Sequence, residues 1–519
     1  MATTRTKLPR PRKRVLVAGL LACAGAATTT LLLTGASDPA ATSPYDFNGD
    51  GIADLTIGLP GNTVAGHVDA GSLVVANGTS SGPASTSVRI DQQTTGVPGA
   101  AEANDYFGNS FASADFDADG YADLAVSSPF EAIGTTGGAG WVTVHYGSST
   151  GIHGSRAEGF HEDTPGIPGT TYWDEIFGYS LAAGDLNDDG YGDLVIGQPL
   201  DHAGGGSNAG TLRVIFGSSS GLDAASAIWI DQDTPNVPGV PEAEDRFGEQ
   251  LAIGDIDGDG LNDLVVTTLG EQIQGSSDRG SIHVLFGPFS DAPARGGYID
   301  SGNIDGIGQF AGSALALGQF NDDAYLDVAI GVSDEKVGED GAAGRLAVFY
   351  ADENGLSHDD FELFDQDTPG IAGGPEAEDY FASSLAAGDF DGDGIDDLVL
   401  GMRSEAIGSA TGSGASLILF GNPTGGISTT GAVWIDQDTP SVPGVVYKHD
   451  HFGWTVGALD TDGNGRDEAL IGAPGNAAGT VTVVKASPGS LESAVALSEG
   501  DLGWPAGEDG DAFGIALPR

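Results

Sequence analysis

The stretch DFDADGYAD at residues 115–123 is one of seven related nine-residue segments that decide the fold. Their shared pattern is Asp-x-Asp/Asn-x-Asp-Gly-x-x-Asp, and the seven copies begin at Asp46, Asp115, Asp185, Asp255, Gln319, Asp389 and Asp460. Successive copies start 69, 70, 70, 64, 70 and 71 residues apart. A period this regular indicates one structural unit repeated along the chain.

A phenylalanine followed by glycine or alanine stands eight residues before five of these segments and nine residues before the segment at Gln319. These pairs are Phe107-Gly108, Phe177-Gly178, Phe247-Gly248, Phe310-Ala311, Phe381-Ala382 and Phe452-Gly453. The segment at Asp46 has no such pair upstream, but Phe513-Gly514 stands near the other end of the chain. If the two ends lie together, Phe513-Gly514 supplies the missing pair. This predicts a ring of seven units that is closed by pairing of the N- and C-terminal segments.

Each unit has the pattern of four short strands, as the third unit illustrates. Residues 180–183 are small, and residues 193–197 form an apolar run that is typical of a strand buried on both faces. Residues 211–216 alternate as a half-exposed strand does, and residues 227–231 form the fourth strand. Four antiparallel strands in about 70 residues make one propeller blade. The predicted fold is therefore all-β, a seven-bladed β-propeller.

Each acidic segment offers the oxygen donors that Ca²⁺ prefers, which number six to eight at about 2.3–2.6 Å. Side chains at positions 1, 3, 5 and 9 of the segment can point inward, position 7 can offer its backbone carbonyl, and glycine at position 6 permits the turn. The predicted metal ligands are Asp46, Asn48, Asp50, Ile52, Asp54, Asp115, Asp117, Asp119, Tyr121, Asp123, Asp185, Asn187, Asp189, Tyr191, Asp193, Asp255, Asp257, Asp259, Leu261, Asp263, Asp389, Asp391, Asp393, Ile395, Asp397, Asp460, Asp462, Asn464, Arg466 and Glu468.

Two other interpretations of the acidic segments are weaker. A helix-flanked EF-hand loop needs glutamate at position 12, but here that position is apolar in every copy: Ile57, Val126, Ile196, Val266, Ile330, Leu400 and Ile471. The loop therefore joins two strands. Asp, Asn and Gly also make good turns without a metal. Recurrence of three or four acidic residues at the same alternate positions favours a cation, because clustered carboxylates repel one another.

The seven loops are expected to differ in calcium affinity. Loops 115–123, 255–263 and 389–397 each have four carboxylates and are expected to bind best. Loops 46–54 and 185–193 have asparagine at position 3. Loop 460–468 has asparagine at position 5, Asn464, and glutamate in place of aspartate at position 9, Glu468, and it is expected to bind more weakly.

The loop at Gln319 departs furthest from the pattern. Its carboxylates at ligand positions are Asp323 and Asp327 alone, and Ala324 takes the place of the glycine. We expect this loop to be empty, so the chain would hold up to six Ca²⁺ ions.

The charge of the chain excludes two classes of partner. The sequence has 75 acidic and 19 basic residues, a formal net charge of −56. Six of the basic residues lie within the first 14 positions, so the remainder is more acidic still. Binding to nucleic acid or to anionic lipid requires lysine and arginine, and we expect neither. The excess acid either keeps the surface soluble or binds calcium.

Residues 1–41 are expected to be a signal peptide with a short linker, and residues 42–519 the propeller. A basic start precedes an apolar stretch at 15–33, and cleavage is expected at about residues 36–41. The protein would then be secreted and extracellular. The alternative is a lipid anchor at Cys23, the single cysteine of the chain. No second apolar run of about 18 residues occurs, so no membrane span is expected in the mature chain. We expect a monomer.

These residues resemble the FG-GAP repeats of integrin-α amino-terminal propellers and of their bacterial relatives. The resemblance rests on the Phe-Gly pairs, the acidic loops and a Gly-x-Pro after the second strand at residues 58–60, 197–199 and 472–474, and it covers about residues 45–519. Blades five and six depart from it, with Gly-Val-Ser at 331–333 and Gly-Met-Arg at 401–403. The resemblance implies calcium loops on one face and ligand recognition usually on the other, commonly of proteins or glycans.

Candidate ligand contacts are the residues that break the repeat between blades, where the other blades have Glu-Ala-Glu-Asp or similar. They are Tyr172, Trp173, Tyr447, Lys448 and His449. Exposed aromatic side chains can stack on sugars or anchor proteins, although packing against the neighbouring blade is the alternative. The recurring phrase Ile-Asp-Gln-Asp-Thr-Pro, at 230–235 and 435–440, is expected mainly to shape a turn.

Three functions fit these patterns. The leading hypothesis is an extracellular calcium-binding module that binds a protein or a glycan in adhesion. The alternative is a secreted hydrolase or lyase with its site in the mouth of the propeller, and the third is an acidic structural protein of the cell surface. Gly-x-Ser-x-Gly occurs at 78–82, 147–151 and 217–221. Because it recurs at equivalent positions without a strand-turn-helix context, it is expected to be a hairpin turn and not a hydrolase nucleophile elbow.

Overall fold

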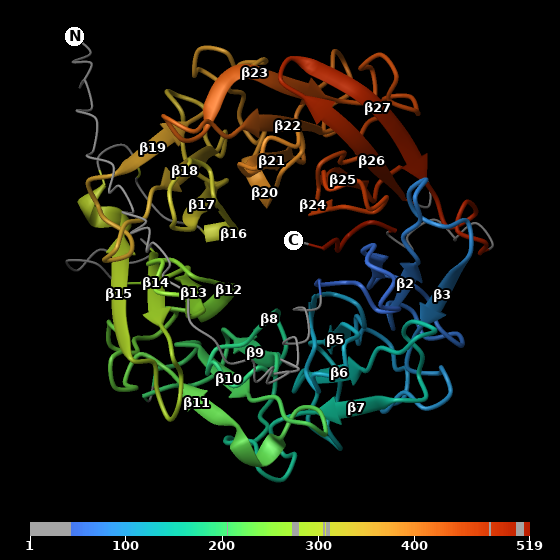
Figure 1. Ribbon diagram of the computed structural model, residues 1–519, viewed down its shortest axis with the longest axis vertical. Helices are drawn as coiled ribbons and strands as arrows, with labels where there is room; N and C mark the ends of the chain where they lie inside the picture. The colour runs from blue at the N-terminus through green and yellow to red at the C-terminus, as the bar shows by residue number, and fades with distance from the viewer. Residues whose placement is uncertain are drawn as a thin grey trace, which may run out of the picture. The chain divides into compact units, whose positions relative to one another are not determined.

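The computed structural model describes residues 43–204, 206–271, 280–304, 307, 312–476, 479–504 and 513–518. Its strands form seven antiparallel sheets that follow one another around a centre (Figure 1). The predicted all-β, seven-bladed propeller is confirmed. The predicted signal peptide, Cys23 and the pair Phe310-Ala311 lie outside the described residues.

The blades take their strands in chain order. Blade 1 contains β1 (Leu55–Leu59), β2 (Ser72–Ala76) and β3 (Ser87–Ile90); blade 2 contains β4 (Phe111–Ala114), β5 (Asp123–Ser128), β6 (Trp141–His145) and β7 (Ala157–Phe160). Blade 3 contains β8 (Ser180–Gly184), β9 (Asp193–Gln198), β10 (Thr211–Ile215) and β11 (Ile228–Ile230); blade 4 contains β12 (Phe247–Gly254), β13 (Asp263–Thr268), β14 (Ser281–Phe286) and β15 (Arg295–Asp300).

The remaining blades repeat this arrangement. Blade 5 contains β16 (Gly312–Gly318), β17 (Asp327–Val332), β18 (Arg345–Phe349) and β19 (Phe361–Phe364); blade 6 contains β20 (Phe381–Gly388), β21 (Asp397–Met402), β22 (Ala415–Phe420) and β23 (Ser428–Ile435). Blade 7 contains β24 (Val456–Leu459), β25 (Glu468–Ala473), β26 (Thr480–Ser487) and β27 (Ser490–Leu497). The helical segments of the described residues are two short 3₁₀ turns, Ala224–Ser226 and Ser301–Asn303, and no helix there is long and apolar enough to cross a membrane.

Within each blade, successive strands are placed from the centre of the ring to its rim. Figure 1 shows β8, β12, β16 and β20 nearest the centre and β7, β11, β15 and β19 at the outside. The second strand of each blade is buried along its whole length, as in β9 with the sequence DLVIGQ. Blades therefore stack face to face, and apolar clusters form between neighbouring sheets, for example around Phe381. The four strands predicted in the third unit correspond to β8–β11 and are confirmed.

The two ends of the propeller meet in blade 1. The Gly58 N–H donates a hydrogen bond to the Ala516 carbonyl at 3.0 Å, which adds the C-terminal segment beside β1. Phe513 forms a parallel bridge with Gly479 of blade 7. The chain end thus contacts both blade 7 and blade 1, and the predicted closure by the two terminal segments is confirmed.

The Phe-Gly pairs lock each blade to the one before it. The phenylalanines are fully buried at Phe107, Phe177, Phe247, Phe381, Phe452 and Phe513. The Phe107 N–H donates to the Ala70 carbonyl of blade 1 at 3.0 Å. The adjacent Gly71 has φ +86°, and a Cβ there would overlap the Phe107 backbone. Only glycine combines this backbone angle with so close an approach.

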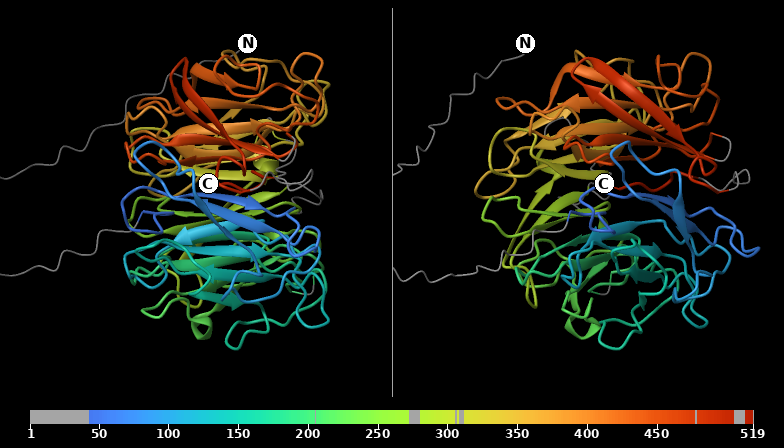
Figure 2. Two further views of the ribbon diagram at one scale, coloured as in Figure 1. Left: turned by 90° about the vertical axis from the view of Figure 1, so that its right-hand side faces the viewer. Right: turned by 45° about the vertical axis from the view of Figure 1, so that its right-hand side comes forward.

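The blades present two different faces. Because consecutive strands are antiparallel, the first-to-second and third-to-fourth strand connections lie at one end of each blade. We call this end the acidic-loop face. The second-to-third strand connections and the links between blades lie at the other end, the junction face. Figure 2 shows loops at both ends of the strands.

The Gly-x-Ser-x-Gly stretches are turns on the acidic-loop face. The Gly151 N–H donates to the Ser148 carbonyl at 2.7 Å, and the Gly221 N–H donates to the Ser218 carbonyl at 2.8 Å. Each turn links the third and fourth strands of its blade. The expectation of a hairpin turn is confirmed.

Candidate functional site

The acidic loops fold around their own carboxylates, as loop 389–397 of blade 6 illustrates. Asp389 Oδ1 accepts the N–H groups of Gly392 at 2.7 Å and Asp393 at 3.1 Å, and its Oδ2 accepts that of Gly394 at 2.9 Å. Asp391 Oδ1 accepts the Asp393 N–H at 3.1 Å. These short-range bonds turn the side chains of positions 1 and 3 inward, because the donors are backbone groups of the loop itself.

The last residue of the loop ties it to the rest of the blade. Asp397 Oδ2 accepts the Phe390 N–H at 3.0 Å, and its Oδ1 accepts the Gly421 N–H at 2.9 Å from beyond the third strand. The same two bonds occur at Asp54, Asp123, Asp193 and Asp263. Position 9 therefore places a buried carboxylate under each loop.

Residues at position 7 have a common backbone role. In all six loops that follow the pattern their N–H donates to the side chain at position 5, at 2.9–3.2 Å. These residues are Ile52, Tyr121, Tyr191, Leu261, Ile395 and Arg466. The bond holds the second half of the loop against the first.

The predicted ligands converge in four of the loops. Groups of three carboxylates offer oxygens that lie within 4.8 Å of one another: Asp115, Asp117 and Asp123; Asp255, Asp257 and Asp259; Asp389, Asp391 and Asp397; Asp460, Asp462 and Glu468. In loop 46–54 the Asn48 amide lies against Asp54, with Nδ2 3.2 Å from Oδ1. In loop 185–193 the Asn187 amide instead donates to Asp189 Oδ2 at 3.0 Å.

The buried carboxylates are costly to ionise where they lie. Burial, with the neighbouring loop carboxylates adding to it, raises the pKa of Asp123 and of Asp397 to about 8 and that of Asp263 to about 6. A cation among the carboxylates would remove this cost. The donors are hard oxygens from side chains, which suit Ca²⁺. The residues present therefore fit a calcium ion held by positions 1, 3, 5 and 9.

The loop of blade 5, residues 319–327, is organised differently. Gln319 Nε2 donates to the Asp323 carbonyl at 2.6 Å, and Asn321 Nδ2 donates to Asp327 Oδ2 at 3.1 Å. Asp327 keeps its structural bond to the Ala351 N–H at 3.0 Å. Amide N–H groups thus stand at positions 1 and 3 of this loop, whereas loops 46–54 and 185–193, which share the position-3 amide, keep a carboxylate at position 1.

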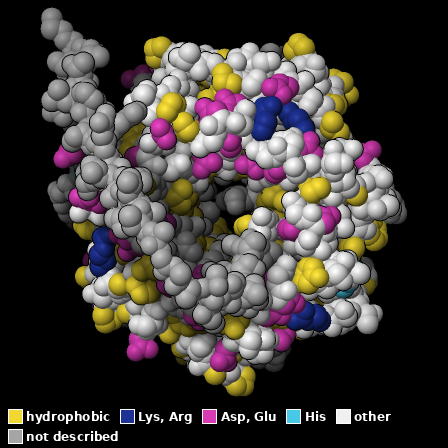
Figure 3. All heavy atoms as spheres, viewed as in Figure 1, with side chains coloured by type: hydrophobic (Ala, Val, Ile, Leu, Met, Phe, Trp, Pro, Cys, Tyr) yellow, Lys and Arg dark blue, Asp and Glu magenta, His cyan; other side chains and the backbone are white. Residues whose placement is uncertain are grey.

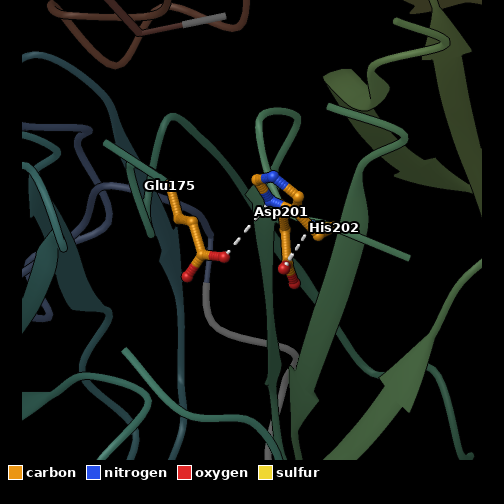
Figure 4. Close-up of side chains that lie close together, drawn as sticks. All are labelled: Glu175, Asp201 and His202. Carbon is orange, nitrogen blue, oxygen red and sulfur yellow. Dashed lines mark hydrogen bonds and ion pairs between the residues drawn. The ribbon is translucent and has the colours of Figure 1, made fainter. Parts of the chain in front are cut away.

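A further cluster, which the sequence analysis missed, lies on the junction face. Glu175, Asp201 and His202 offer ligand atoms within 4.8 Å of one another. Figure 4 shows the two carboxylates side by side with the His202 imidazole nearby. His202 Nδ1 lies 3.6 Å from Glu175 Oε1. The backbone N–H of His202 donates to Asp201 Oδ1 at 2.6 Å. Burial and the charge of Asp201 raise the pKa of Glu175 to about 8.

This cluster is one version of a contact that recurs between blades. In three junctions a glutamine donates its Nε2 to a buried glutamate 39 residues later, at 2.6–2.8 Å. The pairs are Gln92 with Glu131, Gln232 with Glu271, and Gln366 with Glu405. These glutamines belong to the Ile-Asp-Gln-Asp-Thr-Pro phrase and its variants. The phrase therefore joins neighbouring blades as well as shaping a turn.

The junction between blades 2 and 3 exchanges this pair for an ionic one. Glu162 and Asp201 stand 39 residues apart where the other junctions have glutamine and glutamate. The fully buried Arg213 pairs with Glu162 and lies 3.2 Å from Asp201 Oδ2. Because a guanidinium already neutralises these carboxylates, we assign the cluster to the blade junction and not to a metal.

The predicted ligand-contact residues also lie on the junction face. Tyr172, Trp173 and Tyr447 are 62%, 67% and 61% exposed, so most of each aromatic ring is not packed against the neighbouring blade. Lys448 and His449 are exposed beside Tyr447.

A cationic and aromatic group adjoins these residues between blades 6 and 7. The Arg403 guanidinium lies over the Tyr380 ring at 4.0 Å and over the Trp454 ring at 5.6 Å. The His451 ring contacts Trp454 edge to face, with centroids 5.5 Å apart. We call Tyr380, Arg403, Tyr447, Lys448, His449, His451 and Trp454 the blade 6–7 patch.

The centre of the ring holds a cavity of about 490 Å³. Figure 3 shows one face of the molecule, hollowed at its centre, with Asp and Glu side chains at many places around it. Among the described residues that line the cavity, the polar groups are the hydroxyls and amides of residues such as Tyr179, Asn109 and Gln250. Carboxylates, imidazoles, amines and thiols do not occur in that described lining.

The repeats match a known family. The FG-GAP repeat matches residues 107–145, 177–215, 247–285, 381–419 and 452–484. Each match begins at a buried junction phenylalanine and runs into the third strand of one blade. Together with the seven-bladed ring, these matches make the chain an FG-GAP repeat β-propeller.

Related proteins share only part of their length with this chain. Phosphatidylinositol-glycan-specific phospholipase D of Bos taurus is 31% identical over 198 residues, which is 37% of this chain and 22% of that protein. Integrin alpha-PS5 of Drosophila melanogaster is 32% identical over 173 residues, 33% of this chain and 16% of the integrin. The match thus spans about a fifth of these relatives. Among solved structures, the periplasmic gluconolactonase PpgL of Pseudomonas aeruginosa aligns with a TM-score of 0.42 at 12% identity, over 90% of this chain and 99% of that one.

Proposed function

We propose that this chain is an extracellular propeller that binds Ca²⁺ in its acidic loops and uses the junction face to bind a protein or a glycan. The observation that carries the proposal is the convergence of three carboxylates in each of four equivalent loops. Sequence repetition alone does not require such convergence. Loops 46–54 and 185–193 have the same backbone pattern with asparagine at position 3, and the proposal extends to them.

Calcium would act here as a structural element. Each loop connects the first and second strands of its blade, and its position-9 carboxylate also bonds to the residue after the third strand. An ion held at positions 1, 3, 5 and 9 therefore stabilises three strands at once. Extracellular modules bind Ca²⁺ at about 10⁻⁴–10⁻³ M, which suits loops that are open to solvent. The integrin alpha relatives are consistent with an extracellular setting.

The blade 6–7 patch is the best-supported ligand surface. The chain has a formal net charge of −56, yet this patch gathers Arg403, Lys448 and two histidines. Among the described residues Arg403 has no ion-pair partner and is held between two aromatic rings. Aromatic faces with an adjacent cation suit the stacking and hydrogen bonding of a sugar ring or of a protein side chain. Tyr172 and Trp173 provide a second exposed aromatic pair on the same face.

The enzyme alternative has less support. Its site was expected in the mouth of the propeller, and the described lining of the central cavity provides hydroxyls and amides but no strong acid or base. We therefore propose no reaction there. A screen of polysaccharide and ester hydrolysis would detect an activity that this geometry does not suggest.

The proposal is tested by binding measurements with and without calcium. The purified chain is exposed to a panel of soluble polysaccharides and extracellular matrix proteins in about 5 mM Ca²⁺, a concentration above the expected dissociation constants, and again in excess chelator. We expect at least one ligand to bind in Ca²⁺ and to lose most of its affinity in chelator. Binding should fall in Arg403→Gln and Trp454→Ala, with melting temperatures unchanged. Failure of the whole panel would contradict the binding function, and binding that both variants retain would contradict the choice of surface.

A further inference from the structure

Three acidic loops carry a cation of their own. On the acidic-loop face, Arg156 lies 2.6 Å from Asp117 Oδ2 and 3.3 Å from Asp119 Oδ2. Arg295 forms an ion pair with Asp257. Each of the three cations contacts the position-3 carboxylate of its loop, which is one of the predicted calcium ligands.

Lys485 makes the third of these contacts. Its Nζ forms an ion pair with Asp462 and lies 3.1 Å from Glu468 Oε1. It therefore contacts positions 3 and 9 of loop 460–468. Figure 1 places its strand, β26, in the outer half of blade 7.

These cations are held in place by the outer strands of the same blade. Arg156 directly precedes β7, and Arg295 is the first residue of β15. The Arg156 guanidinium lies over Tyr146 at 5.0 Å, and the Arg295 guanidinium lies over Phe286 at 3.3 Å. Stacking on an aromatic ring fixes the side chain in reach of the loop. The pairing is therefore built into the blade.

The other loops lack such a partner. In the described part of the chain no ion pair joins a lysine or arginine to loop 46–54, 185–193 or 389–397. Arg466 of blade 7 packs against Gly392 of loop 389–397, and its guanidinium donates to the Phe390 carbonyl at 2.6 Å and to the Ala486 carbonyl. Its charge lies near Asp391, but it forms no ion pair with a carboxylate of that loop among the described residues. The loops thus fall into a paired class and an unpaired class.

We propose that Arg156, Arg295 and Lys485 are tethered counter-cations that compete with Ca²⁺ for the position-3 carboxylate and so grade the calcium affinities of the loops. This inference rests on the proposed calcium binding. A divalent ion in loop 115–123 needs an oxygen of Asp117, so the guanidinium must either leave that carboxylate or remain beside a second positive charge. Either outcome weakens calcium binding. An aspartate at position 3 therefore does not by itself make a loop strong.

The proposal changes the expected order of the loops. Counting carboxylates ranks loops 115–123, 255–263 and 389–397 together. With the counter-cations included, loop 389–397 has the highest expected calcium affinity of the three. Loops 115–123 and 255–263 then join loop 460–468 among the weaker calcium sites. Without its tethered cation, a paired loop is expected to bind about three to ten times more tightly, the scale of one exposed ion pair with some additional charge repulsion.

Two loops carry their own reporter. Tyr121 and Tyr191 occupy position 7 of loops 115–123 and 185–193. Tyrosine can sensitise the luminescence of Tb³⁺ when the lanthanide replaces Ca²⁺ beside it. Loop 115–123 belongs to the paired class and loop 185–193 to the unpaired class, so one molecule contains a test loop and a reference loop. The Tyr121 ring also lies against Gly49 of loop 46–54, so Asp50→Ala, Asp119→Ala and Asp189→Ala, used with Tyr121→Phe and Tyr191→Phe, assign each signal to its loop.

The experiment titrates the purified chain with Tb³⁺ and then displaces it with Ca²⁺. Arg156→Gln should tighten the Tyr121 signal about three- to tenfold and leave the Tyr191 signal unchanged. Arg246→Gln, which removes the same charge near the junction face, should change neither. Arg295→Gln should likewise increase the calcium affinity of loop 255–263, as measured by calorimetry. This second variant keeps the test valid if Arg156→Gln fails to fold.

The outcomes separate the two proposals. If Arg156→Gln leaves the Tyr121 signal unchanged or weakens it while Tyr191 still reports binding, the counter-cation inference is overturned and calcium binding survives. If neither tyrosine reports a lanthanide and calorimetry finds no Ca²⁺ uptake, the calcium proposal itself fails, and this inference fails with it.

Discussion

The two ends of the blades both bury carboxylates, but they neutralise them in different ways. At the junction face, Glu405 accepts a hydrogen bond from Gln366 at 2.8 Å, and Glu162 pairs with the buried Arg213. At the acidic-loop face, Asp397 accepts two backbone N–H groups while Asp389 and Asp391 converge on it. At the junction face, an amide hydrogen bond, a guanidinium or a proton is sufficient to offset the charge of each buried carboxylate. The acidic-loop face gathers more negative charge than its internal donors offset, which is the physical reason to expect a metal there.

The largest expected effect is the loss of stability on calcium removal. Each occupied loop should stabilise the fold by about 1–2 kcal/mol at roughly 5 mM Ca²⁺ if its dissociation constant is about 10⁻⁴–10⁻³ M. Excess chelator should therefore lower the melting temperature of the purified chain by more than about 5 °C. Differential scanning calorimetry measures the shift, and Mg²⁺ at the same ionic strength is the control. Equal melting temperatures in calcium and chelator would mean that the two faces do not differ in their need for a metal.

Removal of one metal ligand from a strong loop should abolish the calcium-dependent stability that this loop contributes. Asp391→Ala in blade 6 should lose about 1–2 kcal/mol of calcium-dependent stability. The matched variant Asn321→Ala, at the same position in the blade 5 loop, should keep the full calcium-dependent increment. Chemical denaturation in calcium and in chelator gives the two increments. Equal losses in both variants would show that the amide-filled loop and the acidic loop behave alike.

Restoring the pattern in blade 5 should add a site. The triple variant Gln319→Asp, Asn321→Asp and Ala324→Gly replaces the two amide donors with carboxylates and supplies the missing glycine. It should gain one calcium ion and become less stable in chelator, because the new carboxylates then repel one another without a cation. Isothermal titration counts the sites. An unchanged count would refute the assignment of those positions as ligands.

The smallest expected effect concerns the junction face and pH. Burial, and then the charge of Asp379, raises the pKa of Glu405 to about 7. A carboxyl whose pKa is raised on folding stabilises the fold in its protonated form, so this contribution is present at low pH and is lost as the pH rises through about 7. In saturating calcium, Glu405→Gln should flatten the fall in unfolding free energy between pH 4.5 and about 7, the ordinary and the raised pKa of this carboxyl. The exposed variant Glu353→Gln is the control, and an unchanged slope in Glu405→Gln would contradict the assignment.

The fold could be predicted from the sequence because its determinants are local and repeated. The 70-residue spacing, the apolar second strands and the phenylalanine near the C-terminus together predict a closed ring of seven blades. The loop bonds span at most seven residues within each loop, as between Phe390 and Asp397. A nine-residue pattern therefore contains most of the information about the loop.

The contacts between distant residues could not be predicted in this way. Arg156 and Asp117 are 39 residues apart, and Arg295 and Asp257 are 38 apart. The residues between them include hairpins of different length in each blade, so the register of the outer strands is not visible in the sequence. Arg213 lies on a third strand whose other copies have no arginine at that position. The constant spacing of 39 residues between Gln232 and Glu271 and their counterparts was the one signal available for the blade junctions.

The most direct test of the central claim counts calcium on the unmodified chain. The protein is dialysed to equilibrium against about 5 mM Ca²⁺, above the affinities expected of such modules, and the excess bound metal is measured by elemental analysis. We predict six calcium ions per chain, one for each acidic loop except that of blade 5, and fewer than one after dialysis against chelator. A chain that holds no calcium under the first condition would contradict the account, and the acidic loops would then be turns closed by their own hydrogen bonds.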